Sequence, residues 1–156
     1  MDNKSTGLTM IETLTKLFLK DLEKLKTEIS SFKDENKIWK ISGEIKNSAG
    51  NLCLHLCGNL QHFIGAVLGK TGYVRNREAE FSRKNVPIKD LISEIEVTTK
   101  VIEKTLNELD EAILSKTFPV NVFGYEMTTE YFLIFLTTHL NYHLGQINYH
   151  RRLLDN

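Results

Sequence analysis

Three of the five histidines lie in one short stretch near the C-terminus, "THLNYHLGQINYHRRLL", which covers residues 138–154. His139 and His143 are four residues apart, so on a helix their side chains lie on the same face, one turn apart. Apolar residues at three- and four-residue steps, among them Phe132 and Leu136, predict that this face is buried. Two buried imidazoles at this spacing can bind one metal ion, as in the zinc-protease helix motif. The general-base glutamate of that motif is missing from "HLNYH", so we exclude the protease interpretation.

A pair of imidazoles is an incomplete metal site, and His55 is the candidate third ligand. It lies in "LCLHLCGNL", between apolar neighbours in a second stretch of helical period. Three neutral imidazoles leave the charge of a divalent ion intact and at least one coordination position open. A water bound there has a pKa of about 7, and a thiol bound there ionises. The alternative for each histidine taken alone is an ordinary, hydrogen-bonded residue of the core.

Two amides could support these ligands. Asn59 is one turn beyond His55, and Gln146 is three residues beyond His143. Either could hold the second ring nitrogen of its histidine, a contact that fixes the orientation of a metal ligand. An amide that faces cavity water is the alternative for both.

The remaining histidines and the cysteines are interpreted as structural residues. His62 and His150 fall on partly buried faces. Cys53 and Cys57 flank His55 but lie about 200° around the helix from it, so they point away from the ion. We expect them to pack in the core or at a subunit contact, because an i, i+4 helical pair is poorly placed for a disulfide.

Composition excludes several functional classes. Twenty basic and twenty acidic side chains give a formal charge of zero, whereas a nucleic-acid-binding protein shows a basic excess. No apolar run approaches the roughly 20 residues that cross a bilayer, and "MDNKSTGLTM" lacks the layout of a signal peptide. Two cysteines do not make a disulfide framework. We therefore expect a cytoplasmic protein without nucleic-acid or membrane partners.

Four segments with a helical period must position the histidines. They cover about residues 9–32, 48–68, 87–113 and 128–154. In a chain of 156 residues they predict one all-α domain over residues 1–156, a four-helix bundle. The link over residues 69–85, when extended, could span a helix about 30 Å long. The second and third helices could therefore run parallel, with a simple up-down-up-down order as the alternative.

Two motifs resemble a known family. "HLCGNLQHFIGAVLGKTGYVRNREAEF" and "THLNYHLGQINYHRRLL" are similar to the DinB/YfiT-like superfamily, and specifically to its small DUF1572 branch. The resemblance implies a four-helix bundle with parallel second and third helices, joined by the long crossover link. It also implies a divalent ion held by His55, His139 and His143. Some members of the superfamily are thiol S-transferases, including bacillithiol-dependent ones.

The crossover link itself contains a stretch that resembles the family near the open end of the bundle. Tyr73, Arg75 and Arg77 are candidate substrate-binding residues, because paired arginines can hold a carboxylate or phosphate. The alternative is a surface loop tied down by Arg–Glu pairs, with Glu80 as an available partner.

Together these observations predict a metal-dependent enzyme that transfers a small thiol or hydrolyses a small molecule. The nucleophile would be a metal-bound water or thiolate, because no Ser-His-Asp set and no paired catalytic carboxylates are evident. Imidazole suits zinc, nickel, iron and copper, and we expect zinc or nickel, then iron. The expected partners are a small-molecule substrate and a second copy of the chain in a homodimer. The alternative function is a metal-binding scaffold or a metal-responsive binding protein without catalysis.

Overall fold

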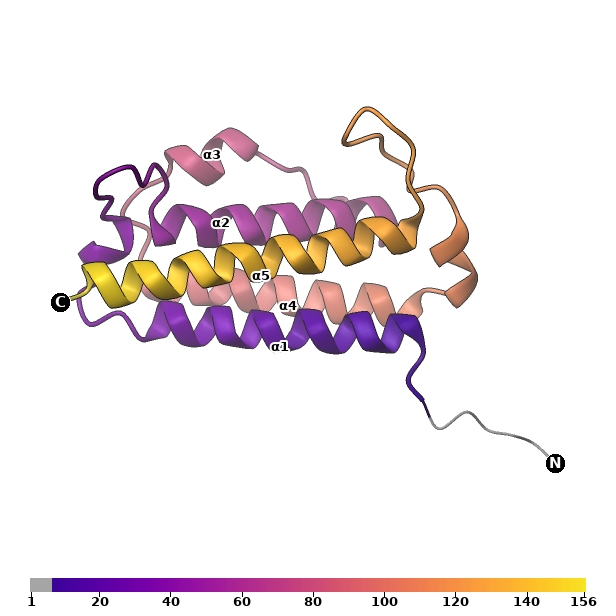
Figure 1. Cartoon of the computed structure of the whole chain (residues 1–156), viewed down its shortest axis with the longest axis horizontal. Helices are drawn as coiled ribbons and strands as arrows, with labels where there is room; N and C mark the ends of the chain where they lie inside the picture. The colour runs from indigo at the N-terminus through magenta and orange to yellow at the C-terminus, as the bar shows by residue number, and fades with distance from the viewer. Residues whose placement is uncertain (1–6) are drawn as a thin grey trace.

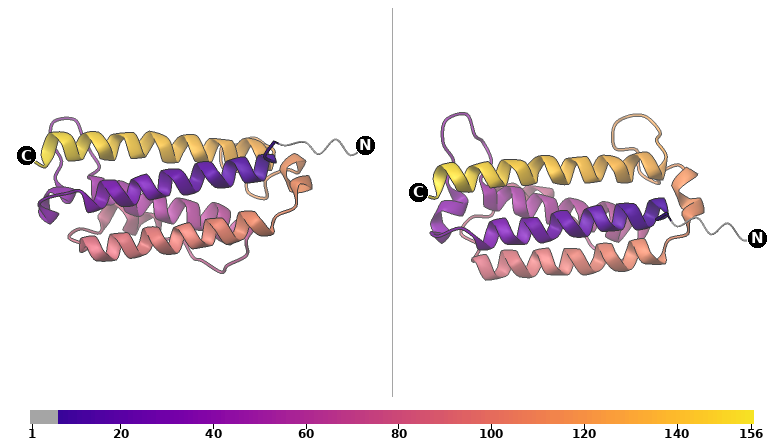
Figure 2. Two further views of the ribbon diagram at one scale, coloured as in Figure 1. Left: turned by 90° about the horizontal axis from the view of Figure 1, so that it is seen from below. Right: turned by 60° about the horizontal axis from the view of Figure 1, so that its bottom comes forward.

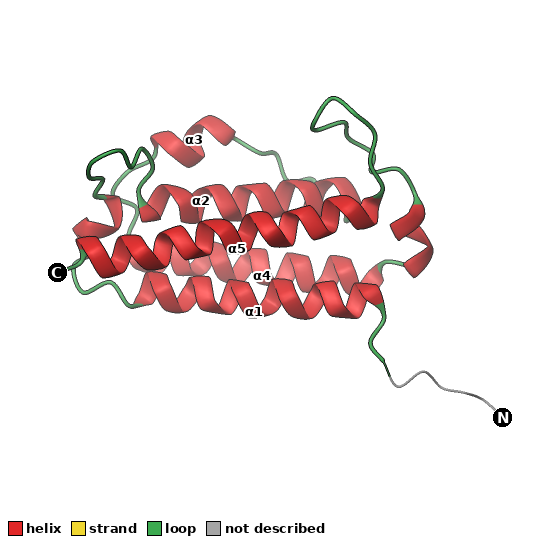
Figure 3. Cartoon of the chain, in the orientation of Figure 1, coloured by secondary structure: helices red, strands yellow, loops and turns green. Residues whose placement is uncertain are grey.

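Four long helices lie side by side along the molecule (Figure 1). The computed structural model describes residues 7–156, and the signal-peptide expectation falls partly on residues 1–6, outside this range. The long helices are α1 (Met10–Ser30), α2 (Ala49–Leu60) with its continuation η2 (Gln61–Leu68), α4 (Ile88–Glu108) and α5 (Thr129–Leu154). Within the described range there is no strand (Figure 3), only an isolated bridge between Thr117 and Thr128. The predicted all-α four-helix bundle is confirmed.

The helices follow the topology with a crossover. α1 and α5 run in one direction, and α2 and α4 run in the other (Figures 1 and 2). The second and third long helices are therefore parallel, as predicted. α1 packs against α4 and α5, and α2 packs against the same two helices. The crossover link carries the short helix α3 (Arg77–Ser82), which lies on the outer side of α2.

Local hydrogen bonds fix where three of the long helices, α1, α2 and α5, begin. The Thr9 hydroxyl accepts a bond from the Glu12 backbone N–H, and the Glu12 carboxylate accepts one from the Thr9 N–H at 2.8 Å. This capping box satisfies two N–H groups that α1 would otherwise leave unpaired. The Ser48 hydroxyl accepts a hydrogen bond from the Asn51 N–H at the start of α2, and the Thr128 hydroxyl accepts one from the Tyr131 N–H at the start of α5. The register of the two histidine-bearing helices is thus set by residues directly before them.

The core runs the full length of the bundle and does not depend on the histidines. Each long helix buries an apolar stripe, and the fully buried large side chains include Phe18, Leu22, Leu56, Ile95 and Phe132. Burying such a side chain contributes about 1.5–3 kcal/mol.

One predicted boundary was wrong. The third helix was expected to reach about residue 113, but α4 ends at Glu108, where Leu109 takes an extended conformation with ψ 143°. The Asp110 side chain then accepts a hydrogen bond from the Ala112 N–H and starts the separate 3₁₀-helix η3 (Glu111–Ser115). An aspartate that bonds to nearby backbone in this way competes with helix continuation.

The end of the second helix also differs from a regular α-helix. From Gln61 to Leu68 the chain forms the π-helix η2, which is a rare form that is frequent at functional sites. A further 3₁₀-helix, η1 (Glu35–Trp39), follows α1. None of the helices in residues 7–156 is both long and apolar enough to cross a membrane.

Candidate metal centre

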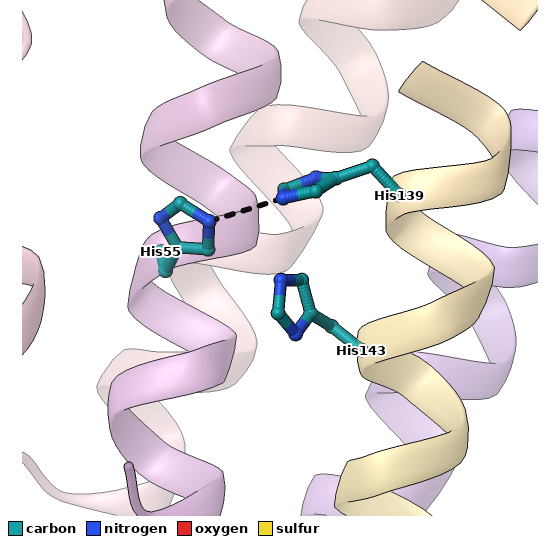
Figure 4. A group of neighbouring side chains, drawn as sticks. All are labelled: His55, His139 and His143. Atoms are coloured by element: carbon teal, nitrogen blue, oxygen red, sulfur yellow. Dashed lines mark hydrogen bonds between the residues drawn. The ribbon is translucent and has the colours of Figure 1, made fainter. Parts of the chain in front are cut away.

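His55, His139 and His143 form one cluster in the middle of the bundle. His55 is on α2, the other two are on α5, and their rings point into a common space (Figure 4). One ligand atom from each residue lies within 4.8 Å of the others. The Nε2 atoms of His55 and His139 are 3.3 Å apart. Two nitrogens bound at about 2.0–2.1 Å to one tetrahedral zinc ion would lie about 3.3–3.4 Å apart, so this spacing fits a shared ion.

A buried carboxylate orients His55. The Nδ1 atom of His55 lies 3.0 Å from Oε1 of Glu80, which is on α3. Arg75 donates to both oxygens of Glu80, from Nε and Nη2, each at 2.8 Å. Burial raises the pKa of Glu80, but the hydrogen bonds from Arg75 and His55 outweigh it and hold that pKa below its ordinary value. Glu80 is therefore ionised and can only accept, so the His55 proton is on Nδ1 and the Nε2 lone pair faces the cluster.

The close approach of Glu80 to α2 depends on Gly58. A Cβ atom at position 58 would lie 2.2 Å from Oε2 of Glu80, closer than atoms can pack. Gly58 is three residues beyond His55 and leaves the space that the carboxylate occupies. The ring of Phe81, the next residue after Glu80, packs against the His55 ring, with 5.0 Å between the ring centroids.

The two histidines of α5 differ in the hydrogen bonding of their Nδ1 atoms. The Nδ1 atom of His143 donates to Oε1 of Gln146 at 2.7 Å, which leaves its Nε2 lone pair for the cluster. The Nδ1 atom of His139 is buried and has no hydrogen-bond partner in residues 7–156. Burial, followed by the nearby His143, His55 and Arg75, lowers the pKa of His139 to about 4. Burial also lowers the pKa of His143, so both rings are neutral at pH 7, as metal binding requires.

Comparison with known families places the chain. Residues 6–156 match the family described as "protein of unknown function (DUF1572)". The chain belongs to the DUF1572 family. This confirms the resemblance to that branch of the DinB/YfiT-like superfamily. A search of curated proteins found no match.

The structure brings some of the other predicted site residues to the cluster of this DUF1572 protein. Gln146 contacts His143 as described above. Asn59 is buried, but it makes no hydrogen bond to the three histidines, and its Oδ1 has no partner in the described part of the chain. A supporting role for Asn59 stays a prediction.

The link residues are not arranged as a pair of anion-binding arginines. Arg75 is engaged by Glu80, while Arg77 is exposed and lies over the Phe81 ring at 5.3 Å. Tyr73 is half-buried in the link. The Arg–Glu pair named as the alternative is thus present, and a substrate-binding role for these three residues stays a prediction.

The remaining histidines and the cysteines lie outside the cluster. His62 is half-buried and His150 is buried, and neither belongs to the group of three histidines that could hold a metal ion. Cys53 and Cys57 are free and fully buried in the core. Hydrogen bonding to Cys57 and burial raise the pKa of the Cys53 thiol well above its ordinary value, so it is protonated and inert.

Glu80 is the residue whose role was missed from the sequence. It was noted only as a partner for the link arginines, although a metal-binding histidine usually donates its second N–H to a carboxylate or carbonyl. The signal in the sequence that could have indicated this role was the presence of an acidic residue, Glu80, in the link that crosses back over α2. The contact with His55 spans 25 residues and depends on how α3 packs.

Proposed function

We propose that this DUF1572 protein is a metal-dependent enzyme in which His55, His139 and His143 hold one divalent transition-metal ion. The observation that supports the proposal best is the convergence of three imidazole nitrogens within 4.8 Å, two of whose rings, those of His55 and His143, are oriented by Glu80 and Gln146. A divalent ion in such a site lowers the pKa of a coordinated water or thiol, so that a nucleophile is available at neutral pH.

The residues of the chain have distinct parts in this proposal. Glu80 accepts a hydrogen bond from the Nδ1–H of His55 and so holds the His55 Nε2 toward the cluster. Arg75 keeps Glu80 ionised and in place through two hydrogen bonds. Gln146 holds the His143 ring, and burial keeps the His139 ring neutral. The surroundings of the three histidines thus favour the ring orientations and the neutral state that metal binding requires.

The number of protein ligands favours catalysis over a purely structural role. Among residues 7–156 the cluster contains three histidines and no fourth histidine, cysteine or carboxylate. Structural zinc sites are closed by four protein ligands, whereas catalytic sites keep a position for water or substrate. We therefore prefer the enzyme to the scaffold.

The reaction that we propose is transfer of a small thiol, of the bacillithiol type, with hydrolysis of a small molecule as the alternative. In thiol transfer, the thiol loses its proton to solvent and its sulfur forms a bond to an electrophilic carbon. The leaving group departs with its electron pair. We further propose zinc or nickel as the ion, a cytoplasmic location, and a homodimer, which light scattering of the purified protein would test.

Metal analysis of the purified protein is the first experiment. We expect close to one divalent ion per chain in the wild type and strong loss of the ion in His139→Ala. His62→Ala is the matched control, because His62 lies outside the cluster, and it should keep the ion. Conjugation of a small thiol to an electrophile, assayed for both variants, would then test the reaction. An unchanged metal content in His139→Ala would contradict the site.

A further inference from the structure

The outward face of α5 carries no charged side chain over most of its length. Residues 131–150 contain no aspartate, glutamate, lysine or arginine. Six exposed positions follow one another on this face at three- or four-residue steps: Tyr131, Ile134, Thr138, Tyr142, Gly145 and Tyr149. The exposed positions of α4 include Glu96, Lys100 and Glu103 instead. An exposed stripe of this length without charge is typical of a surface that contacts another protein surface.

Three tyrosines project from this stripe. Tyr131, Tyr142 and Tyr149 are 53%, 65% and 62% exposed. A tyrosine combines a large apolar ring with one hydroxyl group, and tyrosines are enriched where protein surfaces meet. A partner for this stripe must therefore offer apolar space for rings rather than countercharges.

The same face offers such space in the groove between α5 and α1, which run side by side in the same direction (Figures 1 and 2). One hollow of about 420 Å³ is lined by Gly145 and Tyr149, and a second of about 360 Å³ is lined by Leu17 and Tyr142. Because projecting rings and hollows lie on one face, a ring of one copy can fit a hollow of a second copy. The face is thus complementary to itself, as a two-fold interface requires.

The size of the face is also sufficient for a dimer. From residue 131 to residue 153, α5 is about 33 Å long, and α5 with α1 beside it is about 20 Å wide. The flat projection of this face is then roughly 650 Å², and projecting side chains increase its accessible area. Stable interfaces bury about 800 Å² on each partner.

The charges at the two ends of α5 favour one orientation. Glu130 is in the first turn, and Arg151 and Arg152 are in the last turn. In a two-fold dimer with parallel α5 helices, the arginines of the two copies would lie together and repel each other, whereas antiparallel helices separate them. Tyr142 is three residues before Gly145 and Tyr149 is four residues after it. A two-fold axis beside Gly145 therefore places Tyr142 of each copy opposite Tyr149 of the other.

We propose that a second copy of this chain docks on the face formed by α5 and α1, with the two α5 helices antiparallel and the two-fold axis beside Gly145. The inference rests on the homodimer of the proposed function and adds the surface that forms it. Tyr142 also packs edge-on against the His143 ring, with 5.4 Å between the ring centroids. The second copy would therefore border the three-histidine cluster on this side.

Sedimentation velocity of Tyr149→Glu over a range of protein concentrations tests the face. The substitution places a carboxylate in the interface twice, once from each copy, and should raise the Kd of the dimer about 100-fold or more. Val97→Glu is the matched control, because Val97 is 49% exposed on α4, and it should dimerise as the wild type does. Both variants should keep the helical circular dichroism and the metal content of the wild type, since neither residue belongs to the cluster.

A disulfide cross-link tests the position of the axis. Gly145→Cys should form a covalent dimer when it is oxidised with diamide, because a residue beside a two-fold axis lies close to its own copy, within the Cα separation that a disulfide needs. Val97→Cys should stay uncrosslinked, and the native Cys53 and Cys57 are fully buried.

The outcomes separate this inference from the proposal on which it rests. A wild-type dimer that Tyr149→Glu leaves intact, or that Gly145→Cys does not cross-link, would overturn the face but not the homodimer. A wild type that remains monomeric at millimolar concentration would contradict both, whereas the metal content of the chain is measured independently of either.

Discussion

Glu80 contacts the cluster only through His55, yet it determines which nitrogen of that ring is free to bind metal. Replacing its carboxylate in Glu80→Gln leaves Arg75 without its buried partner and weakens the hold on the Nδ1 proton. We expect metal affinity to fall about 10–100-fold, the usual effect of losing such a contact. Competition with a chelator of known affinity would measure it.

Glu78→Gln is the matched control, because Glu78 is exposed on the same short helix. It should leave the affinity unchanged. If Glu80→Gln also binds the ion as tightly as the wild type, then Glu80 only anchors the crossover link and does not prepare His55.

At the residue scale, the sequence was sufficient for the cluster but not for its surroundings. His139 and His143 follow from their spacing on an amphipathic helix, and His55 follows from its apolar neighbours. The partner of His143 was also predictable, because Gln146 is three residues away on the same helix. Glu80 was not, since its position depends on tertiary packing rather than on local spacing.

At the scale of elements, α3 can deliver Glu80 only because α2 has a glycine at the crossing. Gly58→Ala would place a Cβ atom 2.2 Å from the Glu80 carboxylate, so the carboxylate must move away from His55. In an open helix position, alanine is more stabilising than glycine by about 0.8–1 kcal/mol. We expect Gly58→Ala to lose this gain and to lower metal affinity as Glu80→Gln does.

Gly145→Ala is the control for that substitution. Gly145 is exposed in the middle of α5, and a Cβ atom there would have no neighbour within 4 Å. This variant should be more stable than the wild type by about 0.5–1 kcal/mol in urea denaturation, with unchanged metal binding. Equal gains in stability for Gly58→Ala and Gly145→Ala would show that the Glu80 carboxylate can move away from α2 at little cost in free energy.

Helix positions could be predicted well because they depend on apolar periodicity and on caps such as Thr9 and Thr128. The end of α4 could not be predicted from the apolar pattern, because that pattern continues to Ile113. The helix ends earlier, and the Asp110 side chain then accepts a hydrogen bond from the Ala112 N–H. The π-helix after Leu60 has no sequence signal of this kind. Apolar residues continue through this segment, and its hydrogen-bond pattern depends on how the segment packs rather than on residue type.

For the whole molecule, acid should destabilise the metal-free protein before its carboxylates titrate. Burial lowers the pKa of His139, His143 and His150 from the ordinary value of 6.5, for His139 to about 4. The unfolded chain therefore binds more protons than the folded one over this interval, so stability falls as the pH falls. The stability that these neutral histidines contribute should be fully present above about pH 6.5 and should decrease progressively as the pH falls toward 4.

Urea denaturation of the chelated protein at pH 7.5, 6 and 5 would measure this effect. His139→Asn should show a smaller pH dependence, because the group with the lowest pKa is removed. A midpoint that does not change from pH 7.5 to pH 5 would mean that these rings are hydrated and titrate normally.

Removal of a bound ion should leave the bundle folded, because an ion held by the three histidines would join only α2 and α5, whereas the apolar core joins all four long helices. We expect chelation to lower stability by the linkage contribution alone, roughly 2.7 kcal/mol when the free ion is at 100 times its Kd. His143→Ala should lose the ion and about 1–3 kcal/mol more through the cavity that it leaves. Circular dichroism should show nearly unchanged helicity in both cases, with a lower Tm. Complete unfolding on chelation would mean that metal-binding energy is folding energy here, which would favour the scaffold; a helical metal-free protein is the behaviour expected of an enzyme whose ion serves the reaction.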